Sequence, residues 1–118
     1  MTQSSTNRSN ETVTAASTGA VAYHRILASR RRRLTIEFLE EGAITSTDLE
    51  TLATAIATRE NGGYAPGEDA ITNVIIDLHH AQLPKLADWG VLEYDPMDRR
   101  IDPSAEAIES LAAARPDW

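Results

Sequence analysis

Apolar residues recur at intervals of three and four over most of the chain, which is the spacing of one buried helix face. Three segments carry this pattern: about Thr18 to Gly42, about Thr47 to Arg59, and Glu68 to Trp89. The Gly/Pro-rich stretch "ENGGYAPGED" separates the second from the third and is typical of a loop. The pattern therefore predicts three successive helices, of which the first is long.

The ends of the second helix are predicted by polar residues. Thr45, Ser46 or Thr47 is expected to cap its N-terminus, because a side-chain oxygen at that position accepts a free backbone N–H. Asp48 and Glu50 then fall in the positive first turn.

Proline interrupts the third helix. Pro84 has no N–H and its ring clashes with the carbonyl of His80, so we expect a kink or a break near Gln82. The apolar spacing continues through Leu83 and Leu86, which favours a kink. Gly90 is the expected C-cap.

Beyond this helix the pattern changes to that of strands. "VLEYD" and "RRID" flank the turn "PMD", which predicts a short β-hairpin, and Ser104 then caps a last helix. Residues 1–16, "MTQSSTNRSNETVTAA", have little to bury and are expected to be a disordered tail. The order of helix, helix, helix, hairpin and helix predicts a mainly α winged helix-turn-helix domain over residues 17–103. Residues 104–118 are the expected C-terminal dimerisation helix.

Composition narrows the functional classes. The 118-residue chain has no cysteine, which excludes disulfides, thiolate metal sites and cysteine nucleophiles. No apolar run reaches the roughly 20 residues of a membrane helix, so we expect a cytoplasmic protein.

The net charge is −7 and the 11 basic residues are nearly all arginine, a profile typical of a salt-adapted proteome. In such a cytoplasm screening weakens the repulsion between this chain and DNA.

Three segments resemble a known family: "LASRRRRLTIEFLEEG", "TDLETLATAIATRENG" and "LHHAQLPKLADWGVLEYD". They are similar to small winged-helix domains of haloarchaea that form a domain family of unknown function, over about Ile26 to Ile101. That family looks like ArsR-type repressors, in which L-x-x-L-x-x-x-G precedes the wing, here Leu83, Leu86 and Gly90. The resemblance implies a DNA-binding regulator of a halophilic archaeon and names no ligand or target.

The third helix and the hairpin carry the candidate DNA contacts. If the leucines at 78, 83 and 86 face the core, the side chains of Asp77, His80, Ala81 and Lys85 fall on the opposite side, where a recognition helix meets a groove. Only Lys85, with Gln82 at the edge, is of a base-reading type. The residues expected to contact double-stranded DNA are His79, His80, Gln82, Lys85, Arg99 and Arg100.

The pair His79 and His80 and the pair Arg99 and Arg100 can also be explained without DNA contact. His79 and His80 point about 100° apart on a helix and lack a His-x-x-x-His spacing, so we expect no metal site there. One ring half-buried and the other solvated explains them as well as DNA contact does. Arg99 and Arg100 lie at the wing tip, where they either touch phosphates or are neutralised on a solvated turn by Asp95, Asp98 and Asp102.

Arg30 to Arg33 form the only dense positive run of the sequence. Four consecutive helical positions cover all sides, so at least one stem must lie along the core, while Arg33 can pair with Glu37 at i+4. We interpret the run as a solvated, salt-bridged face rather than a phosphate patch.

No catalytic constellation is present, so we expect no enzyme, no cofactor and no small-molecule ligand. The sequence predicts a homodimeric, sequence-specific DNA-binding transcriptional regulator. The alternative is a protein interaction module that uses the same fold, because the expected recognition helix is poor in base-reading side chains.

Overall fold

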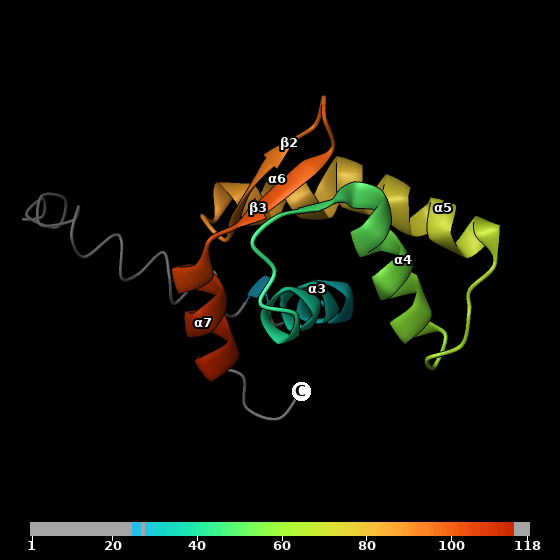
Figure 1. Ribbon diagram of the computed structural model, residues 1–118, viewed down its shortest axis with the longest axis horizontal. Coiled ribbons are helices and arrows are strands. Elements are labelled where there is room, and N and C mark those ends of the chain that lie inside the picture. The colour runs from blue at the N-terminus through green and yellow to red at the C-terminus, as the bar shows by residue number, and fades with distance from the viewer. Residues whose placement is uncertain (1–24, 27, 115–118) are drawn as a thin grey trace, which may run out of the picture.

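The computed structural model describes residues 25, 26 and 28–114, which are mainly helical with a small antiparallel sheet (Figure 1). The predicted disordered tail, residues 1–16, lies outside the described residues. The elements in chain order are α3 (Arg30–Glu41), β1 (Thr47–Asp48), α4 (Leu49–Glu60), α5 (Glu68–Asp77), the π-helix η1 (Leu78–Gln82), α6 (Leu83–Asp88), β2 (Leu92–Asp95), β3 (Arg100–Pro103) and α7 (Ala105–Ala114).

The predicted first helix is not continuous. Ser29 has an extended backbone, with φ −108° and ψ 125°, and its hydroxyl accepts the backbone N–H of Arg32 at 3.3 Å. Serine satisfies free N–H groups at a helix start better than it fits a helix interior, so α3 begins only at Arg30. Ile26 is helical and buried on the other side of this break. The prediction of one helix from about Thr18 to Gly42 is therefore wrong at Ser29.

The second helix is capped one residue later than predicted. Asp48 is the N-cap of α4, and its Oδ1 accepts the backbone N–H of Thr51 at 2.8 Å. Thr47 precedes the cap, and both residues pair with β3 as strand β1, Thr47 with Ile101 and Asp48 with Arg100. Glu50 does lie in the first turn, as predicted.

The third helix changes its winding where the proline requires it. Between α5 and α6, the five residues of η1 form a π-helical turn, and the Leu83 N–H donates to the carbonyl of Leu78. Because Pro84 offers no N–H, the chain absorbs one extra residue here instead of breaking. The predicted interruption near Gln82 is confirmed, and it takes the form of a wider turn.

Gly90 ends this helix as predicted. Its φ of 78° is left-handed, a conformation that glycine adopts without the strain of a Cβ. The Gly90 N–H donates to Ala87 at 3.0 Å and the Val91 N–H to Leu86 at 2.9 Å, which is the Schellman pattern. The turn directs the chain into β2.

The hairpin is confirmed and has a third strand that the sequence did not reveal. The sheet order is β1-β3-β2, with Tyr94 opposite Ile101 and Asp95 opposite Arg100. In Figure 1 the hairpin lies over α6, and its turn stands above the rest of the molecule. The sheet thus joins the start of α4 to the end of the third helix.

One core holds these elements together. Leu78, Leu83 and Leu86 are fully buried, as predicted, with the β3 residue Ile101. Fully burying a leucine contributes about 1.5 to 3 kcal/mol, so these side chains fix the third helix firmly. The core residues are Ile26, Leu34, Ile36, Leu39, Leu49, Leu52, Ala53, Ile56, Ala57, Val74, Leu78, Leu83, Leu86, Val91, Leu92, Ile101, Ile108 and Leu111.

The C-terminal helix packs within its own chain. Ser104 caps it, accepting the N–H of Ala107 at 3.3 Å, and α7 lies against α3 (Figure 1). Its apolar residues Ile108 and Leu111 are 5% and 2% exposed. Both residues are therefore already covered within the chain, and the homodimer stays a prediction that α7 does not require.

Candidate nucleic-acid interface

His79 joins the π turn to the hairpin. Its Nδ1 lies 2.6 Å from the hydroxyl of Tyr94 on β2, and the two rings meet edge to face. His79 is half-buried, whereas His80 is exposed with its ring centroid 4.9 Å away. One ring packed and one solvated is the simpler of the two interpretations drawn from the sequence. His80 is exposed to solvent, whereas His79 holds the hairpin of β2 and β3, which we call the wing.

The pKa of the Tyr94 phenol is raised by the position of this residue on β2. Burial is the main cause that raises the pKa of Tyr94, and Asp95 adds to it, while the nearby positive charge of Arg99 acts in the opposite direction. Arg99 therefore lies within electrostatic reach of the contact between His79 and Tyr94.

We expect Tyr94→Phe to lower the free energy of unfolding by about 1 kcal/mol, because it deletes the bond to His79. The unfolded phenol loses its proton near its ordinary pKa of 10.0, below the folded value. This contribution is thus present below about pH 10 and is lost as pH rises through the folded pKa. Denaturant melts at about pH 9 and about pH 11 should show that the free energy of unfolding falls less between these two pH values in the variant than in the parent.

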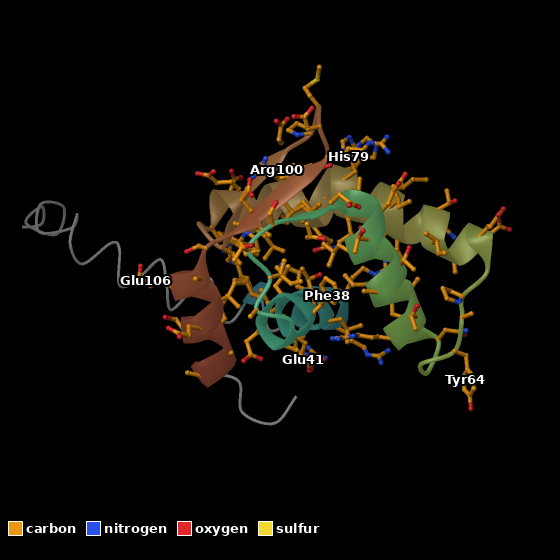
Figure 2. The ribbon with its side chains drawn as sticks, viewed as in Figure 1. Phe38, Glu41, Tyr64, His79, Arg100 and Glu106 are labelled. Atoms are coloured by element: carbon orange, nitrogen blue, oxygen red, sulfur yellow. The ribbon has the colours of Figure 1, made fainter. Side chains whose placement is uncertain are left out.

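Tyr64 is the matched control for this experiment, because it is 76% exposed and stands on the loop between α4 and α5 (Figure 2). Tyr64→Phe removes the same hydroxyl and should leave stability unchanged. Equal effects of both variants would show that the contact between His79 and Tyr94 contributes nothing.

An exposed stripe runs along α5 into η1. Thr72, Asn73, Ile76 and His80 are all exposed, and Ile76 is 51% accessible although it is a large apolar residue. Asparagine reads adenine through paired hydrogen bonds, and an apolar side chain can meet a thymine methyl group. Asn73 and Ile76 are not among the residues predicted from the sequence, because the predicted surface began only at Asp77. The polar spacing of three and four from Thr72 to His80 was the available signal.

Asp77 links α3 to η1, because it contacts both Arg31 and Gln82. Asp77 Oδ2 pairs with Arg31 Nη1 at 3.1 Å and also accepts the Gln82 amide at 3.2 Å. The expectation that Asp77 lies opposite the core is therefore wrong, since the ion pair holds it between helices. The Gln82 amide nitrogen is engaged, and its Oε1 is buried with no hydrogen-bond partner in the part of the chain that the structure describes.

The arginine run is less solvated than expected. Arg31 donates from Nε and Nη2 to the two carboxylate oxygens of Glu60, each at 2.7 Å. The hydrogen bond to Glu60 is the main reason that the pKa of Arg31 is raised further above its usual value. Arg32 lies 5.4 Å from the ring centroid of Trp89, so its stem follows the core as predicted. Among the four, only Arg30 is exposed.

Glu37, the residue predicted to pair with Arg33, receives Arg59 of α4 at 3.5 Å. Arg59 also pairs with Glu41 at 2.9 Å and stands over the ring of Phe38 at 5.6 Å. Figure 2 shows Phe38 and Glu41 on the same helix, α3. These contacts fix α3 to α4 on the face remote from the hairpin.

The wing carries both positively and negatively charged side chains. Arg100 pairs with Asp102 at 3.1 Å, and both side chains are largely solvent-accessible. Exposed ion pairs contribute only about 0 to 1 kcal/mol, so a phosphate could displace this carboxylate. A shallow concavity around Arg100 is rich in acids, and its lining residues are Glu93, Tyr94, Asp95, Pro96, Asp98, Arg100 and Asp102.

The wing turn is held by its own backbone. Asp95 Oδ1 accepts the N–H groups of Met97 and Asp98, and Met97 is 89% exposed at the tip. Arg99 has a φ of 58°, and its carbonyl accepts the Leu49 N–H at 2.9 Å. This geometry presents the side chains of Arg99 and Arg100 at the surface beside the sheet.

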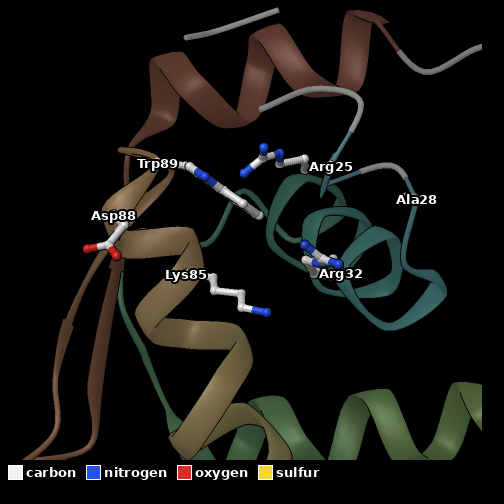
Figure 3. Close-up of a pocket in the computed structure, with 6 residues that line it drawn as sticks. All are labelled: Arg25, Ala28, Arg32, Lys85, Asp88 and Trp89. Carbon is white, nitrogen blue, oxygen red and sulfur yellow. The ribbon is translucent and has the colours of Figure 1, made fainter. Parts of the chain in front are cut away.

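Lys85 lies apart from the other predicted DNA contacts. It is exposed on α6, and it points toward the side of α3 where Arg32 and Trp89 meet (Figure 3). The structure thus joins His79 to the hairpin that carries Arg99 and Arg100. It places Lys85 elsewhere, and it engages the amide of Gln82 with Asp77.

Within residues 25, 26 and 28–114, no three His, Asp or Glu side chains come together to hold a metal ion. No helix in the same part of the chain has the length and apolar character needed to span a membrane.

Comparisons with known proteins complete this description. No curated protein and no solved structure matches the chain. One family does match, over residues 24–102, which is most of the chain and includes α3 through the hairpin. The chain belongs to the family described as Domain of unknown function (DUF7344).

Proposed function

We propose that this protein is a sequence-specific DNA-binding transcriptional regulator of a salt-adapted cell, built on a winged helix-turn-helix. The observation that carries the proposal is the order α3, β1, α4, third helix, β2 and β3, with the sheet order β1-β3-β2. This arrangement projects one helix and one hairpin turn from a common core. Helices and hairpins are the elements that enter or flank DNA grooves.

In this proposal the exposed stripe of α5 and η1 enters the major groove. Asn73 and His80 supply polar contacts to bases, and Ile76 supplies an apolar one. Arg99 and Arg100 contact phosphates from the wing. The cluster of His79 and Tyr94 sets the distance between the two contact surfaces, because it fastens the π turn to β2.

A homodimer belongs to the proposal because regulators of this kind bind two half-sites of a palindromic operator. The surface between protomers is not α7 through Ile108 and Leu111, since both side chains are buried within the chain.

A second candidate function is supported by the acidic concavity of the wing. Glu93, Asp95, Asp98 and Asp102 surround Arg100 there, and such a surface repels phosphate and attracts basic partners. With the exposed tip residue Met97, the wing would then dock on a basic protein surface. The two functions differ in their ligand and share the fold.

Binding to DNA at several salt concentrations separates them. Duplexes recovered by chromatin immunoprecipitation of the tagged protein would be labelled and titrated by fluorescence anisotropy with the full chain. We expect the logarithm of affinity to fall linearly with the logarithm of KCl concentration, and a preference for recovered over scrambled duplexes. Far-UV circular dichroism at each KCl concentration controls for folding. If recovered and scrambled duplexes bind equally weakly at every salt concentration, the protein-interaction function replaces the regulator.

A further inference from the structure

Three cationic side chains from distant parts of the sequence surround one pocket. Figure 3 shows it between α6 and the start of α3, and its volume is about 460 Å³. Pockets of roughly 300 to 1,000 Å³ hold small organic ligands. The lining residues are Arg25, Ala28, Arg32, Lys85, Asp88 and Trp89.

Arg32 gives this pocket an unsatisfied donor. Its Nε is buried and has no hydrogen-bond partner among the described residues, although buried N–H groups are normally paired. Its guanidinium lies over Trp89 with the centroid 5.4 Å away, so the ring holds it in place. Burial lowers the pKa of Arg32, against the opposing charge of Asp77, which indicates a guanidinium poorly compensated by its surroundings.

The charge of the pocket favours a dianion. Arg25, Arg32 and Lys85 carry three positive charges against the one carboxylate of Asp88. In Figure 3 that carboxylate is turned away from the three cations. A phosphate monoester carries nearly two negative charges at neutral pH, and guanidinium groups bind phosphate through paired hydrogen bonds.

We propose that this pocket binds a small phosphate monoester, with its phosphate held by Arg25, Arg32 and Lys85 and its organic group against Trp89. The ligand is small rather than a nucleic acid backbone because the pocket has a volume of only about 460 Å³. In Figure 3 the three cations lie on one side of α6 and the hairpin lies on the other, so a duplex on the wing would not reach them. The inference does not rest on the proposed regulator function, because binding is measured without DNA.

The experiment follows the Nε–H resonances of arginine in the uniformly ¹⁵N-labelled full chain, with affinities from calorimetry at one fixed KCl concentration. Phenyl phosphate is the probe, and inorganic phosphate tests the contribution of the organic group. We expect a shift of the Arg32 Nε–H signal and tighter binding of phenyl phosphate than of inorganic phosphate. Lys85→Gln should weaken phenyl phosphate binding about tenfold or more, since it deletes a charged partner.

Arg30→Gln is the matched control, because Arg30 is exposed on the same helix as Arg32 and is not among the lining residues. It should change the affinity less than about twofold, since an exposed charge outside the pocket is screened by salt. Arg32→Lys keeps the charge but loses the planar fork, and it should also weaken binding about tenfold. Should Arg32→Lys fail to fold, Lys85→Gln and the Arg32 resonance still decide the matter.

Three results would overturn the inference. One is the absence of any shift of the Arg32 signal with phenyl phosphate. Another is an equal loss of affinity in Lys85→Gln and Arg30→Gln, which would mean that only overall charge attracts the anion. The third is a shift of the Arg32 signal with a short duplex but not with phenyl phosphate, which would assign the pocket to a DNA backbone.

Discussion

Replacing Arg99 and Arg100 together by alanine is expected to weaken binding to duplex DNA about 60-fold at 0.1 M salt. Each phosphate contact contributes a factor that varies as the salt concentration to the power of about −0.9, which is about eightfold at 0.1 M. Losing two contacts therefore weakens binding about 60-fold at 0.1 M salt. By the same relation, the loss of affinity is about fivefold at roughly 0.4 M salt. The slope of affinity against salt should fall by about 2, equally for recovered and scrambled duplexes.

Two further variants keep this test interpretable. Arg99 has a φ of 58°, so Arg99→Gly relieves the left-handed backbone and serves if the alanine variant folds poorly. Arg30→Ala removes one exposed charge from α3, away from the wing, and should leave the salt slope unchanged. If the double variant binds as tightly as the parent at equal salt, the wing does not contact DNA. The acidic concavity around Arg100 then becomes the better guide to function.

Arg31→Ala should lower the free energy of unfolding by about 2 to 3 kcal/mol. Arg31 makes two hydrogen bonds to Glu60 and one to Asp77, all charge-assisted, and its side chain is 28% exposed. Removing the guanidinium leaves two partly buried carboxylates without this cation. Because solvent screens part of the interaction, the loss stays below that of a fully buried pair. The thermal midpoint should fall by about 10 °C or more.

The matched variants separate charge from geometry. Arg31→Lys keeps the charge but cannot contact both oxygens of Glu60 in a planar fork, so it should recover less than half of the loss. Arg30→Ala should stay within about 0.5 kcal/mol of the parent, as exposed substitutions do. Equal melting of Arg31→Ala and Arg30→Ala would mean that the ion pairs with Glu60 and Asp77 contribute nothing to stability.

The sequence predicted the helices and the hairpin because each has a strong local signal. Leu83 and Leu86 repeat at helical spacing, and Gly90 stops the helix through its own backbone freedom. The π turn had a signal that went unused: Leu78 and Leu83 are both buried and lie five residues apart, one more than an α-helix places on the same face. Together with Pro84, that spacing indicates one residue too many for regular α winding.

The remaining features depend on contacts across the fold. Thr47 and Asp48 form a strand only because Ile101 and Arg100 lie beside them, and two residues carry no periodicity. The apolar pattern on both sides of Ser29 hid the cap that separates α3 from the preceding turn.

The site was harder to predict than the fold. Gln82 looked like a base-reading residue, and its amide is engaged by a carboxylate that is itself held by Arg31. Arg32 and Lys85 are 53 positions apart, so no motif could indicate that they line one pocket. Asn73 had the right chemistry, but its exposure follows only from the packing of α5 on α4.

The bond from the Leu49 N–H to the carbonyl of Arg99 makes the wing and α4 one mechanical unit. The first N–H groups of a helix have no partner within the helix, and this one is satisfied by the hairpin. Displacing the hairpin would leave the Leu49 N–H without this acceptor, whereas the side-chain cap from Asp48 to the Thr51 N–H lies within α4. Any movement of the hairpin away from the start of α4 exposes the Leu49 N–H to solvent. The hydrogen-exchange rate of the Leu49 amide therefore measures how often the hairpin moves.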